Sequence, residues 1–246
     1  MADADWNNAA AVANSAEIVA GWEARSARLR AQHKTSMDRR YGPAERNRID
    51  LFPGREDAPL LAFIHGGYWQ ARSKEVFSFI AEGPLAWGMN VALIGYTLAP
   101  QKRLDGIVAE IRAALDWLDE KYGNKLLVSG WSAGGHLTAM AMNHPAVEAG
   151  LAISGIYDLE PIRHCYVNDK LGLDEAEARR NSPGPIAKPL VLAYGADELP
   201  NLRDQSENYA RRLDREAMAL PRHNHFTILE ELASPQGALT GVVRTL

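Results

Sequence analysis

The sequence predicts an α/β fold in which a mostly parallel central sheet carries helices on both faces. Short apolar runs without a polar face recur along the chain, and such runs are typical of strands buried on both sides. Helical patterns separate the runs, as expected for a doubly wound sheet. The runs are residues 60–64, 90–95, 126–128, 151–153 and 190–194.

The remaining elements follow from periodicity. Residues 8–33 are rich in Ala, Glu and Arg and predict an N-terminal helix packed over the body. Residues 46–52 alternate in polarity and predict an entry strand. An apolar stripe over 107–118 predicts a central helix, and similar patterns occur at 202–218 and after Phe226.

Residues 157–188 interrupt this pattern with short helical fragments and with Pro183 and Pro185. Ligands of open α/β sheets bind outside the carboxyl ends of the strands. We therefore expect this segment to be an insertion that caps one end of the sheet and forms part of a pocket wall. The length of 246 residues suits a single domain spanning 1–246.

Composition excludes several classes of protein. The chain is 46% hydrophobic and 24% charged, which is ordinary for a globular domain and unlike a disordered or fibrous chain. The net charge of −4 and the lack of a long basic run argue against a nucleic-acid or polybasic membrane partner. A single cysteine, Cys165, and an acidic N-terminus without a signal-peptide pattern lead us to expect a cytoplasmic protein.

The strongest signal for chemistry is the segment Gly130–Gly134, which fits G-x-S-x-G. It follows a predicted strand and precedes an Ala-rich helix, which is the setting of the nucleophile elbow of α/β-hydrolases. A side chain at Gly130 or Gly134 would collide with the neighbouring strand or helix. The turn exposes the hydroxyl of Ser132, which we predict to be the nucleophile. The alternative is a helix-capping serine in a glycine turn.

A second glycine-rich segment, His65–Trp69, ends an earlier strand. α/β-Hydrolases place an oxyanion-binding loop at this point of the chain. We expect the backbone N–H groups of Gly67, Tyr68 and Ala133 to bind the oxyanion, and His65 to hold the loop. Tyr68 and Trp69 could form an aromatic wall for the substrate, although ordinary packing explains Trp69 equally well.

A serine nucleophile needs a base and an acid, in the chain order serine, acid, histidine. His225 precedes the last predicted helix and is the expected base, with His223 as its rival. The acid should follow the strand 190–194, where Asp197 and Glu198 are both plausible; we favour Glu198 and keep Asp197 as the alternative. None of the histidines shows the spacing of metal ligands, so we expect no metal and no cofactor.

With these motifs in place, the sequence resembles the arylformamidases, also called kynurenine formamidases. These α/β-hydrolases release formate from N-formylkynurenine in tryptophan breakdown. The resemblance covers about residues 41–230. The segments that carry it are His65–Trp69, Gly130–His136, Ser154–Ile162, Arg180–Pro183 and Asn224–Phe226.

The resemblance implies roles for individual residues. Ser132 matches the family's nucleophile and His225 its base. The family's acid stands two residues before a proline and seven before a Gln-Ser pair, which selects Glu198, although the family usually has aspartate there. Trp131 and Gly135 replace the family's usual histidine and alanine, and the first change bears on the substrate rather than on the chemistry.

These observations lead to three hypotheses. The first is a cofactor-independent serine hydrolase of aryl formamides, with N-formylkynurenine as the expected substrate. The second is a carboxylesterase for small aryl esters. The third is a non-catalytic binding protein on a hydrolase fold. We expect a small aromatic molecule as the partner, and the sequence is equally compatible with a monomer and a homo-oligomer.

Overall fold

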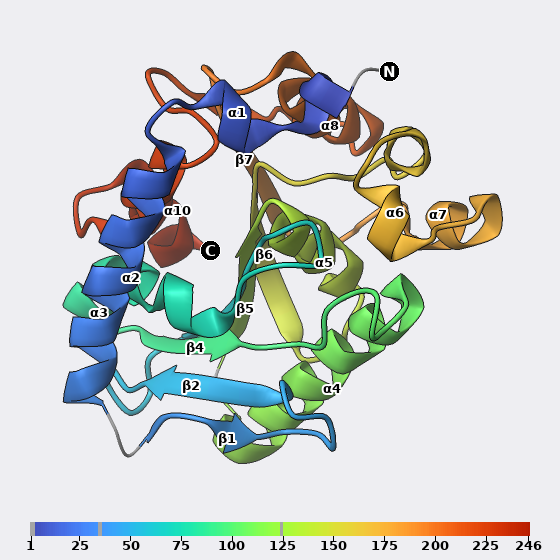
Figure 1. Ribbon diagram of the computed structural model, residues 1–246. Coiled ribbons are helices and arrows are strands. Elements are labelled where there is room, and N and C mark those ends of the chain that lie inside the picture. The colour runs from blue at the N-terminus through green and yellow to red at the C-terminus, as the bar shows by residue number, and fades with distance from the viewer. Residues whose placement is uncertain (1–2, 34–35, 124) are drawn as a thin grey trace.

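A computed structural model describes residues 3–33, 36–123 and 125–246 (Figure 1). Its centre is an eight-stranded sheet with the order β1-β2-β4-β3-β5-β6-β7-β8. Strand β2 runs antiparallel to β1 and β4, and every other neighbouring pair is parallel. The predicted mostly parallel sheet is therefore confirmed. The strands are β1 Arg39–Arg40, β2 Arg48–Phe52, β3 Leu60–Ile64, β4 Asn90–Ile94, β5 Leu126–Trp131, β6 Val147–Ile153, β7 Leu190–Gly195 and β8 Met218–Leu220.

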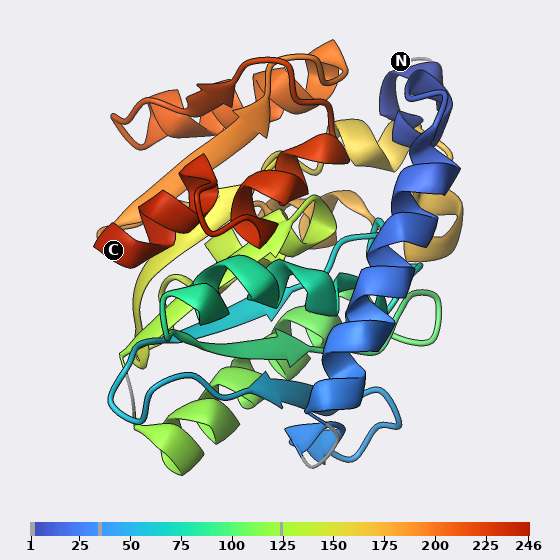
Figure 2. The ribbon, with the colours of Figure 1, turned by 90° about the vertical axis from the view of Figure 1, so that its left-hand side faces the viewer.

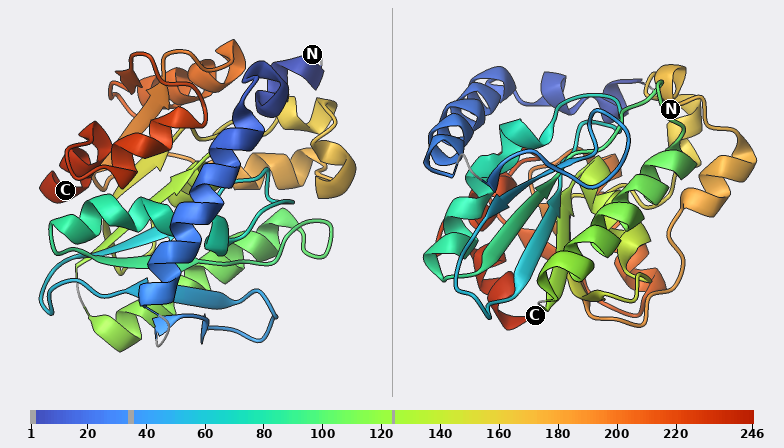
Figure 3. Two further views of the ribbon diagram at one scale, coloured as in Figure 1. Left: turned by 60° about the vertical axis from the view of Figure 1, so that its left-hand side comes forward. Right: turned by 90° about the horizontal axis from the view of Figure 1, so that it is seen from below.

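Helices cover both faces of the sheet, as the view from below in Figure 3 shows. One face packs on α4 (Leu104–Tyr122), α5 (Ala133–Ala141) and α8 (Pro200–Arg212). The other packs on α2 (Ser15–Gln32), the 3-10 helix η3 (Lys74–Ala81), α9 (Glu230–Ala233) and α10 (Ala238–Thr245) (Figure 2). The shorter helices are η1 Asp3–Trp6, α1 Asn8–Ala11, α3 Glu82–Ala86, η4 Pro161–His164, α6 Asn168–Leu171, α7 Glu175–Asn181 and η5 Thr227–Leu229. None of the helices in the described ranges is long and apolar enough to cross a membrane.

Two expected helices differ from the structure. The segment 8–33 forms two helices, α1 and α2, because Val12 adopts an extended conformation with φ −120° and ψ 102°. The helix expected over 202–218 ends at Arg212, the chain turns through Asp214 with φ +55°, and β8 follows. β8 has three residues, which is too short for an alternating pattern to predict.

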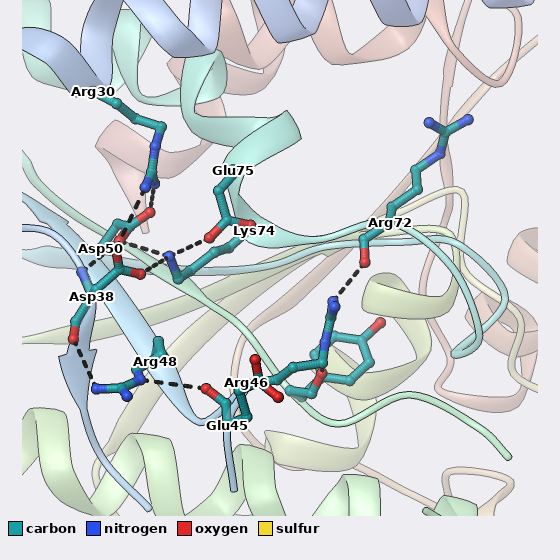
Figure 4. A network of polar contacts seen from close by, with 10 residues as sticks. Arg30, Asp38, Glu45, Arg46, Arg48, Asp50, Arg72, Lys74 and Glu75 are labelled. Carbon is teal, nitrogen blue, oxygen red and sulfur yellow. Dashed lines mark hydrogen bonds and ion pairs between the residues drawn. The ribbon is translucent and has the colours of Figure 1, made fainter. Parts of the chain in front are cut away.

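A network of ion pairs around Asp50 links helix α2 to the sheet (Figure 4). Arg30 near the end of α2 pairs with Asp50 on β2. Lys74 at the start of η3 donates to the same carboxylate at 2.8 Å and to Glu75 at 2.6 Å. Asp50 has no exposed surface, so its charge is compensated within the protein.

The segment 157–188 contains η4, α6 and α7. It lies against the N-terminal residues: the backbone N–H of Tyr166 donates to Asp3 at 2.9 Å, and its hydroxyl donates to the carbonyl of Trp6 at 3.4 Å. Trp6 is itself fully buried. The insertion and the N-terminus thus meet beyond the carboxyl ends of the strands, where a pocket was expected.

Candidate active site

Ser132 occupies a strained turn between β5 and α5. Its backbone has φ +59° and ψ −120°, a region that non-glycine residues rarely adopt, and its N–H donates to the carbonyl of Ile153 at 2.8 Å. A Cβ on Gly130 would lie 2.3 Å from the carbonyl oxygen of Gly134, and a Cβ on Gly134 would lie 2.0 Å from that of Ile64. The steric explanation for both glycines is confirmed, and the turn has the shape of a nucleophile elbow.

The structure brings Ser132, His225 and Glu198 into one hydrogen-bonded chain. His225 Nε2 lies 3.1 Å from Ser132 Oγ, and His225 Nδ1 lies 3.1 Å from Glu198 Oε2. These residues come from the β5–α5 turn, the loop before η5 and the loop after β7. All three side chains are buried, which shields the chain of hydrogen bonds from bulk water.

Glu198, rather than Asp197, faces the histidine. Its Oε1 accepts hydrogen bonds from the Ser154 hydroxyl at 2.5 Å and from the Gly195 N–H at 2.7 Å. Asp197 is exposed to solvent. Both oxygens of Glu198 are thus occupied by donors, and the carboxylate is held in one orientation.

Ser154 is a site residue to which the sequence analysis assigned no role. It follows β6 directly, is fully buried and has φ +51°. Its position at the carboxyl end of a parallel strand, next to Gly155, was the available signal. The bond to Glu198 spans 44 residues of sequence, so spacing alone does not reveal it.

Trp131 contacts the loop that carries His225 and stabilises its position. The Trp131 Nε1–H donates to the carbonyl of His225 at 2.7 Å, and the two rings lie 4.6 Å apart. His223 points elsewhere, with Nε2 3.0 Å from Glu231 and Nδ1 3.2 Å from the carbonyl of Thr227. His225 is therefore the histidine that reaches the serine.

The glycine loop after β3 passes beside the elbow. A Cβ on Gly66 would lie 3.0 Å from the Cβ of Ser132, and Gly67 has φ +116°, which favours glycine. Within residues 3–33, 36–123 and 125–246, the N–H groups of Gly67, Tyr68 and Ala133 donate to no protein acceptor. Free N–H groups in this position are what an oxyanion site requires.

His65 has the surroundings expected of a residue that supports the loop. Its Nδ1 lies 2.8 Å from the carbonyl of Gly66, and its ring stacks on Tyr96 with centroids 4.3 Å apart. Burial lowers the pKa of His65 to about 4, so the ring is neutral at ordinary pH. The neutral His65 ring therefore places no additional positive charge beside the turn that carries Ser132.

A cavity of about 440 Å³ opens onto the serine and the histidine. Ser132 and His225 lie in its lining, and aromatic side chains form part of its walls. The N-terminal segment and the insertion both contribute. The aromatic lining residues are Tyr68, Trp131, Tyr166 and Phe226.

One expectation about these walls is wrong. Trp69 does not line the cavity: it is fully buried in the core, where its Nε1–H donates to His136 Nδ1 at 3.2 Å. Tyr68 does line it, with its hydroxyl donating to the carbonyl of Trp6 at 2.6 Å. Adjacent residues in this turn point in different directions, so only one of the pair can reach the pocket.

Comparisons with known proteins agree with this fold. The BD-FAE family model matches residues 51–168. Kynurenine formamidase of Danio rerio is 32% identical over 240 residues, which cover 87% of this chain and 82% of that protein. A crystal structure of a proposed thioesterase from Silicibacter sp. TM1040 has a TM-score of 0.91 at 28% identity and covers 98% of this chain and 97% of that one.

A more distant structure shares the fold alone. Esterase B of Lactobacillus rhamnosus superposes with a TM-score of 0.66 at 18% identity, covering 95% of both chains. The shared fold, the elbow and the level of identity to the formamidases lead to one assignment. The chain belongs to the kynurenine formamidase family of α/β-hydrolases.

Proposed function

We propose that the protein is a serine hydrolase that cleaves an aryl formamide, with N-formylkynurenine as its substrate and kynurenine and formate as products. The observation that carries the proposal is the hydrogen-bonded chain Ser132–His225–Glu198 at a cavity with aromatic walls. Membership of the kynurenine formamidase family supports the choice of substrate.

In the first half of the reaction, Ser132 Oγ attacks the formyl carbon while His225 Nε2 takes the hydroxyl proton. Glu198 accepts from Nδ1–H, which fixes the tautomer in which Nε2 is free to act as a base. When the imidazole becomes positively charged, the negative charge of Glu198 stabilises it. Because the other donors to Glu198 are the neutral groups of Ser154 and Gly195, that charge is not already paired with a cation.

The negative oxygen of the tetrahedral intermediate would be bound by the free N–H groups of Gly67, Tyr68 and Ala133. Such donors contribute about 3 kcal/mol each to stabilising the transition state. They are fixed by the glycine loop and by the start of α5 before the substrate arrives, so little reorganisation is needed during the reaction.

The intermediate then collapses. His225 returns its proton to the departing aniline nitrogen, the carbon–nitrogen bond breaks, and a formyl ester remains on Ser132. A water molecule, deprotonated by His225, attacks that ester and releases formate. The aryl leaving group would occupy the aromatic part of the cavity lined by Tyr68 and Phe226.

Comparing kcat/KM of the purified enzyme for N-formylkynurenine and for phenyl acetate tests this proposal. We expect the formamide to be preferred, and we expect Ser132→Ala to abolish both activities. A preference for phenyl acetate would favour the alternative, a carboxylesterase for small aryl esters using the same three residues. A protein inactive on both but able to bind the aromatic product would be a binding protein on a hydrolase fold.

A further inference from the structure

The cavity contains an arginine without a partner among the residues that the structure describes. Arg72 lines the same cavity as Ser132 and is half-buried. Its guanidinium forms no ion pair or hydrogen bond with any residue that the structure describes. Burial lowers the pKa of Arg72, and only the more distant charge of Glu23 opposes this effect. A partly desolvated guanidinium without an acceptor is unfavourable, and an anion from solution would relieve it.

The backbone around Arg72 is held firmly. Figure 4 shows its guanidinium directed away from the buried ion network, while Arg46 donates to its carbonyl at 2.6 Å. Arg46 also donates to the carbonyl of Tyr96 at 2.9 Å, and the N–H of Ala71 donates to the carbonyl of Gly67 at 3.0 Å. These hydrogen bonds fix the backbone of the loop that carries the expected oxyanion donors, and they thereby fix the position of the Arg72 Cα.

A second polar group in the lining also lacks a partner. Asn8 is 6% exposed; its Nδ2 donates to the Tyr68 hydroxyl at 2.9 Å, but its Oδ1 accepts from no donor in the described part of the chain. The charges of the other lining residues cancel: Asp169 and Lys170 lie at the exposed rim of the cavity and have opposite charges. Among the side chains that line the cavity, Arg72 therefore supplies the one positive charge that no lining carboxylate offsets.

We propose that Arg72 determines specificity by binding a carboxylate on the leaving group of the substrate. This inference rests on the proposed function and deepens it, because it assigns the side chain that recognises the carboxylate of N-formylkynurenine. The planar guanidinium can donate two parallel hydrogen bonds to a carboxylate, an arrangement that a neutral aryl formamide or ester cannot use.

The test compares two substrates that differ only in charge, N-formylkynurenine and its α-carboxamide. We expect Arg72→Gln to lower kcat/KM for the carboxylate by about 10- to 100-fold, mainly through KM, and for the carboxamide by less than about threefold. Arg72→Lys should recover part of the loss, since it keeps the charge without the paired donors. Equal losses on both substrates would overturn the proposal.

Two matched variants control for other effects. Arg179→Gln removes the same charge from an exposed site on α7, where Arg179 faces Glu175 at 3.8 Å, and should leave the preference for carboxylate unchanged. Glu23→Gln removes the one carboxylate among the described residues whose charge acts on Arg72, and it should also preserve the preference. If Glu23→Gln abolishes the preference as Arg72→Gln does, Arg72 serves the packing of α2 instead.

The two proposals can fail separately. If the wild-type enzyme hydrolyses phenyl acetate but not N-formylkynurenine, the formamide function is wrong, and the subsite is tested with 3-acetoxybenzoate against phenyl acetate. The carboxylate member should then be preferred, and Arg72→Gln should remove the preference. Calorimetry of kynurenine with Ser132→Ala gives a readout without turnover: adding Arg72→Gln should weaken binding about 10- to 100-fold, and unchanged affinity would refute the subsite.

Discussion

Two buried carboxylates in this protein have partners of different kinds. Asp50 on β2 accepts from Lys74 at 2.8 Å and pairs with Arg30, so two full positive charges compensate it. Within the described part of the chain, Glu198 after β7 accepts from the Ser154 hydroxyl, the Gly195 N–H and His225, and from no cationic side chain besides this histidine. Asp50 is fully buried and Glu198 is 6% exposed, so burial does not distinguish them.

The difference in partners indicates a difference in role. The charge of Asp50 is compensated by two cations, and removing it would leave Lys74 with only the exposed carboxylates of Asp38 and Glu75, and Arg30 with only Asp38 at 3.9 Å. The charge of Glu198 is held by neutral donors, so it is available when the adjacent imidazole gains a proton. We therefore expect changes at Asp50 to affect stability, and changes around Glu198 to affect the rate of reaction.

The largest effect should follow from Ser132→Ala. It removes the proposed nucleophile without disturbing either carboxylate, and we expect kcat to fall by several orders of magnitude, up to about 10⁶-fold. The free energy of unfolding, measured by chemical denaturation, should not fall. A variant that keeps a tenth or more of the wild-type rate would show that Ser132 is not the nucleophile.

Glu198→Gln should come next. The amide keeps the shape but loses the charge that stabilises the imidazolium and selects the tautomer, and the loss in kcat could reach about 10⁴-fold. Asp197→Asn is the matched control, because Asp197 is the exposed neighbour and should have little effect. A severe loss in Asp197→Asn together with an active Glu198→Gln would reverse the assignment.

Asp50→Asn should show the opposite pattern. Removing the buried carboxylate from between Lys74 and Arg30 should lower the free energy of unfolding by about 3–5 kcal/mol at most, measured in urea, because only the exposed Asp38 and Glu75 remain beside these cations. The rate per folded molecule at low temperature should stay close to that of the wild type. A large loss of kcat in a fully folded variant would show that the ion network around Asp50 also affects the reaction, so that Asp50 and Glu198 would not differ in role.

Buried histidines add a third kind of titratable group. Burial lowers the pKa of His136 from 6.5 to about 4, as it does for His65, so the folded protein resists protonation at these sites. Between pH 6.5 and about pH 4, the unfolded state therefore binds more protons than the folded state does. Stability should therefore be full above about pH 6.5, fall as the pH is lowered to about 4, and lose on the order of 3 kcal/mol per histidine.

The measurement is urea denaturation at a series of pH values for the wild type and His136→Gln. Glutamine can still accept from Trp69 and donate to the carbonyl of Asn181, the two partners of His136. The variant should lose less stability on acidification. If both proteins show the same dependence on pH, His136 does not carry this share of the acid sensitivity.

The smallest effect should come from Ser154→Ala. Ser154 is a positioning residue that acts through Glu198, and losing one hydrogen bond to a carboxylate should lower kcat about tenfold. KM and the free energy of unfolding should change little. A change confined to stability would place Ser154 with the structural residues instead.

The sequence alone determined the features that depend on local geometry. The alternation of apolar runs and helical stripes predicted the sheet and most of its order along the chain, because burial on both faces of a strand leaves no polar positions. The elbow around Ser132 was predictable because only glycine fits beside such a turn, as the contacts of Gly130 and Gly134 show. Chain order was enough to favour the pair His223 and His225 over the earlier histidines, and the structure decided between these two.

Only the tertiary structure decided how side chains from distant segments meet. Asp197 and Glu198 are adjacent in sequence, but one faces water and the other His225; Tyr68 and Trp69 divide in the same way between cavity and core. The contact between Asn8 and Tyr68 joins residues 60 positions apart. The direction in which each of these side chains points depends on the packing of several elements at once, so it cannot be predicted from a short stretch of sequence.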